Sequence, residues 1–169
     1  GGAAAFATNC ASCHGAGGAG QAGGFPVLAD DAWLWGGTLE DIHTTLLHGI
    51  RWAGDEDTRF SEMPVFADGI LEREQIAQVA DYVRSLSING TATDEGETIF
   101  AENCAACHGE NGEGMQELGA PRLNDQIWLY GGDREALIAQ IGRPKQGVMP
   151  AWQGRLADET IKMLTVYVH

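Results

Sequence analysis

Basic residues are scarce in this 169-residue chain, with 10 lysines and arginines against 24 aspartates and glutamates and a formal net charge of −14. A nucleic-acid-binding surface needs clustered Lys and Arg side chains that displace counterions from phosphates, so no nucleic-acid partner is expected. The chain also lacks the run of about twenty apolar residues that a membrane-spanning helix requires. It has no charged segment followed by an apolar one, as a signal peptide would have. We expect the residues given to be soluble.

No cysteine is left over for a disulfide, a nucleophile or an additional metal ligand, because all four belong to two Cys-x-x-Cys-His motifs, at 10–14 and 104–108. Residues i and i+3 of a helix share a face, so both thiols of a pair can add to one porphyrin while the following histidine reaches its iron. A lone Cys-x-x-Cys is also found in redox dithiols and half zinc sites. A zinc ribbon, however, places its pairs closer together and needs no histidine after each second cysteine. The motifs therefore predict two haem c groups, with Cys10, Cys13, Cys104 and Cys107 as thioethers and His14 and His108 as ligands.

The two motifs belong to two copies of one sequence unit. The Gly-x-x-x-Phe pattern at 2–6 recurs at 96–100, the Trp-Leu-Trp-Gly-Gly segment at 33–37 recurs as Trp-Leu-Tyr-Gly-Gly at 128–132, and a Met-Pro pair occurs late in each copy. The first copy is longer by about nine residues, which we place within 51–61. The polar stretch around residue 90 reads as a linker. We therefore predict one domain at 1–88, a linker at 89–93 and a second domain at 94–169.

Strand-like alternation is absent, and the periodic segments are helical. Apolar residues at 76, 79, 80 and 83 form an i, i+3, i+4, i+7 stripe that recurs near the end of the chain. Thr38 followed by Asp41 is typical of a helix start. Each domain is smaller than a core alone stabilises well, so a covalent cofactor is expected to hold it together. The sequence predicts an all-α fold.

Each haem iron needs a second axial ligand, and the Met-Pro pairs supply candidates. Proline pushes the preceding residue into an extended conformation, so Met63 and Met149 should project from loops ahead of each last helix. Thioether sulfur suits ferrous iron and raises its reduction potential. We predict Met63 for the first haem and Met149 for the second. His48, which has no counterpart in the second copy, is the alternative for the first haem, although His43 and His48 are more simply read as exposed helix positions.

A proline follows each haem histidine at nearly the same distance. The backbone carbonyl of Pro26 or Pro121 could accept the imidazole N–H and fix the orientation of the ring. Large aromatic side chains recur around these motifs and should exclude water from the haem. The candidate pocket walls are Trp35, Phe66, Tyr130 and Trp152.

Each copy resembles a class I cytochrome c domain in its Gly-x-x-x-Phe helix, Cys-x-x-Cys-His-Gly motif, Pro loop, Met-Pro loop and aromatic-bearing last helix. The segments at 24–37, 127–132 and 147–152 extend the resemblance to the dihaem subunit (subunit III) of cbb3-type cytochrome c oxidases. The resemblance covers nearly the whole chain. It implies two tandem class I cytochrome c domains, each a few helices around a covalent haem c. It also implies that first and last helices cross, with Phe6 near Tyr82 and Phe100 near Tyr167.

The resemblance further implies an electron-transfer module that is not itself an enzyme. Electrons would arrive from a soluble donor cytochrome c and pass through other subunits of a membrane terminal oxidase to the oxygen-reducing centre. The region would lie on the periplasmic side of the bacterial inner membrane, and the full-length parent would be membrane-anchored. Two alternatives share the haem motifs: a free dihaem electron carrier, and a haem-based gas sensor with one weak ligand. A dihaem peroxidase is disfavoured, because no cysteine is spare and both Met-Pro loops offer a closing ligand.

Overall fold

The computed structural model describes residues 1–88 and 91–169, so residues 89 and 90 of the expected linker lie outside the described residues. The described residues form α-helices, two 3-10 turns (Ala16–Gly18 and Gln116–Leu118) and isolated bridges, with no β-strand among them. The helices are α1 (Gly2–Asn9), α2 (Ala11–His14), α3 (Leu39–His48), α4 (Arg73–Ser87), α5 (Asp94–Asn103), α6 (Ala105–His108), α7 (Arg134–Gly142) and α8 (Asp158–Val168). The all-α prediction is confirmed. No helix in this described part is long and apolar enough to cross a membrane.

Local chemistry explains where several helices begin. Thr38 and Asp41 form a reciprocal capping box at the start of α3, as the sequence predicts. The Thr93 side chain accepts the Gly96 N–H at the start of α5, and Asp133 caps α7 in the same way. The predicted apolar stripe of α4 is buried along its whole length. These four helices thus follow from sequence signals that lie within each segment.

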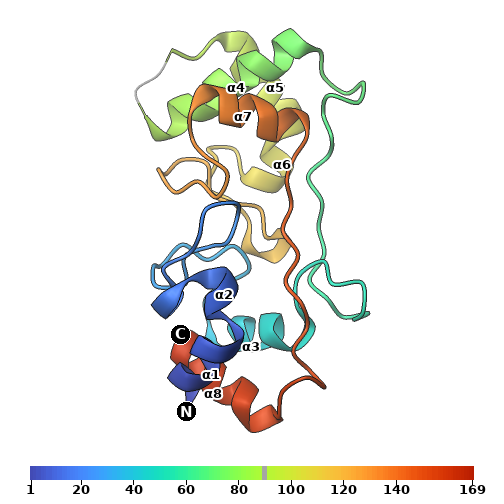
Figure 1. Ribbon diagram of the computed structural model, residues 1–169. Helices are drawn as coiled ribbons and strands as arrows, with labels where there is room; N and C mark the ends of the chain where they lie inside the picture. The colour runs from blue at the N-terminus through green and yellow to red at the C-terminus, as the bar shows by residue number, and fades with distance from the viewer. Residues whose placement is uncertain (89–90) are drawn as a thin grey trace. The chain divides into compact units, whose positions relative to one another are not determined.

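The compact units of the structure do not coincide with the two sequence copies. Unit 1 consists of residues Gly1–Ser61 and Gly147–His169, and unit 2 of the continuous segment Glu62–Gln146. Unit 1 therefore holds α1, α2, α3 and α8, whereas unit 2 holds α4 to α7 (Figure 1). The predicted boundaries at 88 and 94 separate sequence copies, but the chain passes between compact units at 61–62 and 146–147. Each unit contains the Met-Pro loop and the last helix of the other copy.

The packing of the first and last helices shows this exchange directly. In unit 1, α1 packs on α8, and the rings of Phe6 and Tyr167 lie 5.2 Å apart. In unit 2, α5 packs on α4, and the rings of Phe100 and Tyr82 also lie 5.2 Å apart. The expected pairs, Phe6 with Tyr82 and Phe100 with Tyr167, are wrong. First and last helices do pack together, but each first helix has the last helix of the other copy as its partner.

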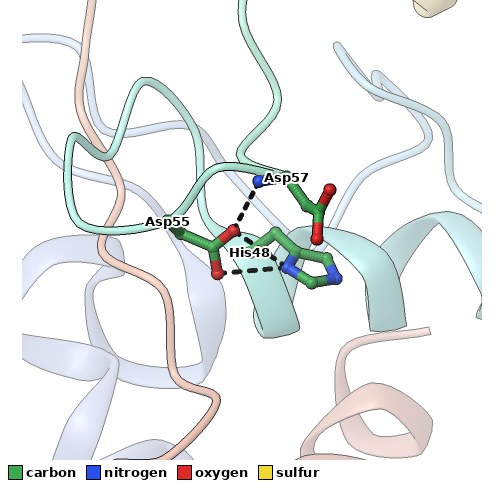
Figure 2. Close-up of side chains that lie close together, drawn as sticks. All are labelled: His48, Asp55 and Asp57. Carbon is green, nitrogen blue, oxygen red and sulfur yellow. Dashed lines mark hydrogen bonds and ion pairs between the residues drawn. The ribbon is translucent and has the colours of Figure 1, made fainter.

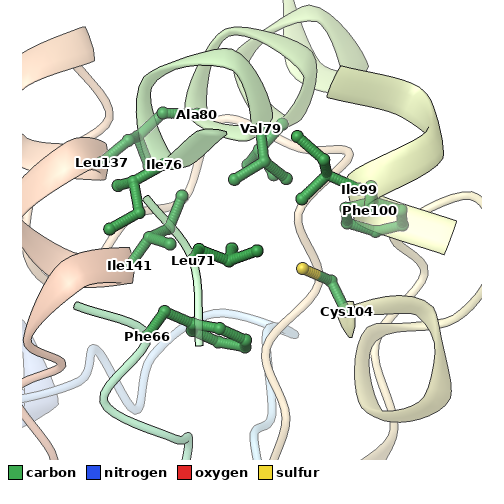
Figure 3. Close-up of a cluster of buried hydrophobic side chains, with 11 residues drawn as sticks. Phe66, Leu71, Ile76, Val79, Ala80, Ile99, Phe100, Cys104, Leu137 and Ile141 are labelled. Atoms are coloured by element: carbon green, nitrogen blue, oxygen red, sulfur yellow. The ribbon is translucent and has the colours of Figure 1, made fainter. Parts of the chain in front are cut away.

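A separate hydrophobic core forms in each unit. The core of unit 2 combines the α4 stripe with Phe66, Leu71 and Cys104, together with side chains of α5 and α7 (Figure 3). The core of unit 1 joins Phe6 and Cys10 to Ile42 and Leu46 of α3 and to two residues of α8. Burying one large apolar side chain contributes about 1.5–3 kcal/mol. Each core includes the first cysteine of one Cys-x-x-Cys-His motif, so each motif is fixed to the packed part of its unit.

Candidate haem sites

Each cysteine motif lies at a junction between two short helices. The Cys10 N–H donates to the Phe6 carbonyl at 2.8 Å, and the His14 N–H donates to the Cys10 carbonyl at 2.9 Å. Cys104 and His108 repeat this arrangement in unit 2, at 2.8 and 3.0 Å. All four thiols are free; the first of each pair is buried and the second is exposed. Each motif therefore presents one thiol at the core and one at the surface.

The buried thiols do not have the character of a redox dithiol. Burial raises the pKa of the Cys10 thiol and raises the pKa of Cys104 to about 11, with the neighbouring thiol of each pair adding to the effect. A nucleophilic dithiol needs a depressed pKa that keeps one sulfur as thiolate near neutral pH. The environment of these two thiols therefore disfavours the dithiol alternative.

Each haem-motif histidine is oriented by a proline carbonyl. His14 Nδ1 lies 3.2 Å from the Pro26 oxygen, and His108 Nδ1 lies 2.9 Å from the Pro121 oxygen. An Nδ1–H that donates to a carbonyl leaves Nε2 as the atom with a free lone pair. Burial lowers the pKa of both histidines, and the proline hydrogen bond opposes this shift only in part. Both imidazoles therefore favour the neutral form, which is the form that binds a metal.

The two candidate methionines lie in units opposite to those expected from their sequence copies. Met149 is half-buried and packs against the core of unit 1, which contains Cys10. Its backbone exchanges two hydrogen bonds with Ile50, at 2.9 and 3.0 Å. Met63 is half-buried and packs against the core of unit 2, which contains Cys104. The structure thus brings Met149 together with the first motif and Met63 together with the second.

Two of the four expected pocket walls take part in the same exchange between sequence copies. Trp35 is buried in unit 1 under the Arg59 guanidinium, 5.7 Å from the ring centre, and Trp152 packs against the core of the same unit. Phe66, from the first copy, is 4% exposed in the core of unit 2. Tyr130, which also belongs to unit 2, is half-buried. Phe66 and Trp152 therefore lie with the motif of the other copy.

Two leucines that the sequence analysis did not single out pack against these cores. Leu28 lies against the core of unit 1 and Leu123 against the core of unit 2. Each is the second residue after the proline whose carbonyl faces the histidine. The recurrence of Pro-x-Leu in both copies was the signal that could have identified them. The proline loop thus supplies an apolar side chain as well as a carbonyl.

His48, the alternative ligand, holds the loop that follows α3. Its Nδ1 lies 3.1 Å from both carboxylate oxygens of Asp55, and the Asp57 N–H donates to the same carboxylate at 2.8 Å (Figure 2). His48 and His43 are half-buried, so the expectation that they are exposed is wrong. The possible ligand atoms of His48, Asp55 and Asp57 lie within 4.8 Å of one another. The contact that the structure shows for His48 is the anchoring of this loop.

The residues of both sites fit covalently attached haem c. Each unit supplies a pair of free thiols, a neutral histidine with its Nδ1 oriented, and a methionine on an extended loop. Apolar side chains around them provide the dry surroundings that a haem requires. These donors match histidine–methionine ligation of haem iron.

Comparisons with known proteins agree with this chemistry. Residues 1–87 match the family model "Cytochrome c", and residues 91–168 match "Cytochrome C oxidase, cbb3-type, subunit III". The chain is 54% identical to the cbb3-type cytochrome c oxidase subunit CcoP of Cereibacter sphaeroides over 99% of this chain and 59% of the relative. It is 56% identical to subunit FixP of Azorhizobium caulinodans, over 98% of this chain and 57% of the relative.

The chain therefore spans a little under three fifths of the length of these relatives. The two family models divide it near the linker that the repeat predicts, and together they cover almost all of it. Two cytochrome c domains imply two covalently bound haem c groups, one for each Cys-x-x-Cys-His motif. The chain belongs to the cytochrome c family, as a tandem pair of domains related to subunit III of cbb3-type oxidases.

Proposed function

We propose that this chain is a two-haem electron relay that carries electrons toward the oxygen-reducing centre of a cbb3-type terminal oxidase. The observation that carries the proposal is the pair of complete donor sets, each with two thiols, one oriented histidine and one methionine in a single compact unit. An iron with both axial positions filled by protein passes single electrons and offers no place for oxygen to bind. The chain acts as an electron-transfer module and not as the catalytic centre.

The ligand pairs in this proposal are His14 with Met149 and His108 with Met63. Three features support the crossed pairing: the membership of each compact unit, the core against which each methionine packs, and the exchanged aromatic pairs of the helices. The expected pairs within each copy, Met63 with the first haem and Met149 with the second, are replaced by this assignment. The four ligands themselves are unchanged.

When bound, haem c supplies a one-electron ferric/ferrous couple, and the protein sets its potential. The proline carbonyls orient the two histidines, and each methionine would be the second protein ligand of the iron. The walls formed by Trp35 and Trp152 in unit 1 and by Phe66 and Tyr130 in unit 2 exclude water.

The partners in this proposal are a soluble donor cytochrome c and the other subunits of the oxidase. The names of the relatives support the second, because those proteins are oxidase subunits. The net charge of −14 supports a donor with a basic docking face, since opposite fields steer association. Location on the periplasmic side of the inner membrane, within a membrane-anchored parent, completes the proposal.

Carbon monoxide tests whether both irons are closed. We expect the absorption spectrum of the reduced, haem-loaded chain to be unchanged by carbon monoxide, because methionine occupies the open side of each iron. A change equivalent to one haem would contradict the closed relay and favour the gas-sensor alternative. A change equivalent to two haems would show that methionine closes neither iron.

Single-haem variants test the crossed pairing. With Cys104 and Cys107 replaced by alanine, only the first haem is attached, and Met149→Ala should abolish the charge-transfer band of methionine-ligated ferric haem while Met63→Ala leaves it. Replacing Cys10 and Cys13 instead should reverse this dependence. If a single-haem variant fails to fold, nuclear Overhauser contacts in the two-haem protein between each methionine methyl and the assigned thioether protons answer the same question. The pairing within copies would be shown by the opposite pattern.

A further inference from the structure

The two methionine loops are extended segments, so something other than helix or sheet must fix where their sulfur atoms lie. Among the described residues, each loop is held by hydrogen bonds from a polar side chain close to the point where the chain passes between units. The side chain is Arg51 in unit 1 and Gln146 in unit 2. Neither residue is repeated in the other copy, because Arg51 lies in the extra segment of the first copy and Gln146 aligns with Phe60.

Arg51 binds both segments of the chain at the border of unit 1, the one that leaves it and the one that returns to it. Its Nε donates to the Ser61 carbonyl at 2.9 Å, and its Nη1 donates to the Gly147 carbonyl at 2.8 Å. The adjacent Ile50 exchanges two backbone hydrogen bonds with Met149. The guanidinium is a rigid fork, so it can bind two carbonyls at once with a fixed separation. Residues 147 and 149 are thus both held against the same short segment.

The backbone of Arg51 is itself in a demanding conformation. Its φ is +50°, and among the described residues it is the one non-glycine with positive φ. A residue with a Cβ rarely occupies this left-handed region, and such strain persists only where the surroundings enforce it. The surroundings are the closed loop after α3, with the Arg51 N–H on the Arg59 carbonyl, the Arg59 N–H on the Gly49 carbonyl, and His48 on Asp55.

Gln146 holds Met63 in a different way but with the same result. Its side-chain oxygen accepts the Met63 N–H at 2.8 Å, and its side-chain NH₂ donates to the Met63 carbonyl at 3.1 Å. One amide side chain thus supplies both bonds that a neighbouring strand would otherwise make. Both residues are half-buried. The hydrogen bonds act directly on the residue that carries the sulfur.

We infer that Arg51 and Gln146 are positioning residues for the axial methionines, with Arg51 acting on Met149 and Gln146 on Met63. The inference rests on the proposed methionine ligation. A methionine whose backbone is fixed keeps its sulfur at the iron without paying again for the ordering of the loop. We call each of these two side chains, with its hydrogen bonds to a methionine loop, a clamp. Loss of either clamp should weaken one sulfur–iron bond and lower the reduction potential of that one haem, since methionine ligation is what raises it.

The test uses reference variants to identify each haem. Met149→His and Met63→His should each lower the potential of a different couple in a redox titration, because bis-histidine ligation lacks the raising effect of methionine. Arg51→Met should then lower the couple that Met149→His identifies, and Gln146→Leu the couple that Met63→His identifies. In each clamp variant, the charge-transfer band should fall toward about half, because one of two methionine bonds is weakened. The reduced variant should also bind carbon monoxide at up to one haem.

Conservative variants separate positioning from general loosening. Arg51→Lys keeps the charge but lacks the fork, and Gln146→Glu keeps the acceptor for the Met63 N–H but lacks the donor, so both should be intermediate. Arg73→Met, at an exposed position in the first turn of α4, removes the same charge and should change neither couple. The inference is overturned if Arg51→Met and Gln146→Leu leave both couples and the band unchanged, or if either moves both couples equally. A lower thermal midpoint with unchanged potentials would also overturn it.

Failure of this inference can be told apart from failure of the proposed function. The reference variants identify each couple by its methionine, whichever histidine is opposite, so the clamp assignment is read independently of the crossed pairing. If Met149→His and Met63→His change neither couple, the proposed ligation itself is wrong. If they change one couple each and the clamp variants change none, only the positioning role is wrong.

Discussion

At the scale of single residues, Phe66 shows how far sequence position can mislead about which site a side chain serves. It follows Met63 in the first copy but is buried in the core of unit 2. We expect Phe66→Ala to cost about 3–5 kcal/mol, the usual range for removing a buried aromatic ring. It should also shift the potential of the haem at His108, because water gains access there, and leave the other couple unchanged. Thermal unfolding and a redox titration measure both effects.

Phe60 is the matched control for this substitution. It lies six residues earlier and is 64% exposed, so Phe60→Ala should change neither stability nor potential by a measurable amount. The assignment of Phe66 to the second haem would be refuted if Phe66→Ala moved the couple of the first haem instead.

The lowered pKa of His14 and of His108 gives a pH dependence with a definite sign. Burial disfavours protonation in the folded chain, whereas an unfolded histidine titrates near its ordinary value of about 6.5. Above that value the stability contribution is fully present. As the pH falls from there toward the lowered folded pKa, the unfolded state binds protons that the folded state does not, so stability is lost. Iron ligation opposes protonation in the same direction.

We therefore expect the thermal midpoint of the haem-loaded chain to fall as the pH is lowered from 7 toward 5. A midpoint that rises on acidification would contradict the burial of neutral imidazoles.

At the scale of helices, a glycine allows close packing in each unit, Gly2 of α1 against α8 and Gly96 of α5 against α4. A Cβ built on Gly96 of α5 would lie 2.5 Å from the Gln78 carbonyl and 3.1 Å from the Tyr82 Cβ on α4. Alanine is favoured over glycine within a helix by about 1 kcal/mol. Overpacking against a helix backbone costs about 1–3 kcal/mol, and a backbone carbonyl cannot rotate away. We expect Gly96→Ala to destabilise the chain overall, with a lowered thermal midpoint.

Glu97→Ala, at an exposed position one residue further along the same helix, is the control and should be near neutral. Stabilisation by Gly96→Ala equal to the helix-propensity gain would show that α5 and α4 do not approach this closely.

The helices themselves could be predicted from the sequence, but their partners could not. The apolar stripe of α4 and the cap at Thr38 are local signals, and both appear in the structure as expected. The choice between Tyr82 and Tyr167 as the partner of Phe6 is not local, because both tyrosines lie in equivalent last helices. Because the sequence is a repeat, each first helix has two chemically similar candidate partners, and the periodicity within a helix does not distinguish between them.

The same reasoning applies to the candidate sites. The cysteines, the histidines and the proline carbonyls are close in sequence, so spacing alone brings them together in the structure. The methionines are distant in sequence, and their unit depends on where the chain passes between units. Arg51 and Gln146, which bind the two methionine loops, have no counterpart in the other copy, so the repeat pattern did not indicate them.

At the scale of the whole molecule, the net charge bears on the proposed interaction with a donor cytochrome. The formal charge of −14 creates a negative field that should accelerate encounter with a basic cytochrome. We expect the second-order rate of electron transfer from such a donor to fall steeply as salt is added, because screening shortens the reach of the field. Stopped-flow kinetics at increasing ionic strength measure this, and a neutral small-molecule reductant is the control. A rate that is flat with the protein donor would remove electrostatic steering.

Continuity of the chain also differs between the units. Unit 2 is one uninterrupted segment, 62–146, with its own core and its own cysteine motif. We expect this segment, expressed alone with haem attachment, to fold and to retain the methionine charge-transfer band through Met63. The segment 91–169, which follows the boundary between sequence copies, should lack that band because it lacks Met63. Equal bands from both segments would contradict the division into units.

Because unit 1 is discontinuous, the site whose cysteines are synthesised first is the site that is completed second. Of the two cysteine pairs, the one that emerges earlier during synthesis belongs to the unit whose helix α8 emerges after every helix of the other unit. The haem attached to the earlier motif is thus the later of the two to obtain its full surroundings, after the other unit has every residue it needs. A stop codon or proteolytic cut after residue 146 would therefore remove Met149 and α8 from the unit that holds the first cysteine motif. The effect of a truncation or cleavage must therefore be interpreted by the unit that loses residues, and not by distance along the chain.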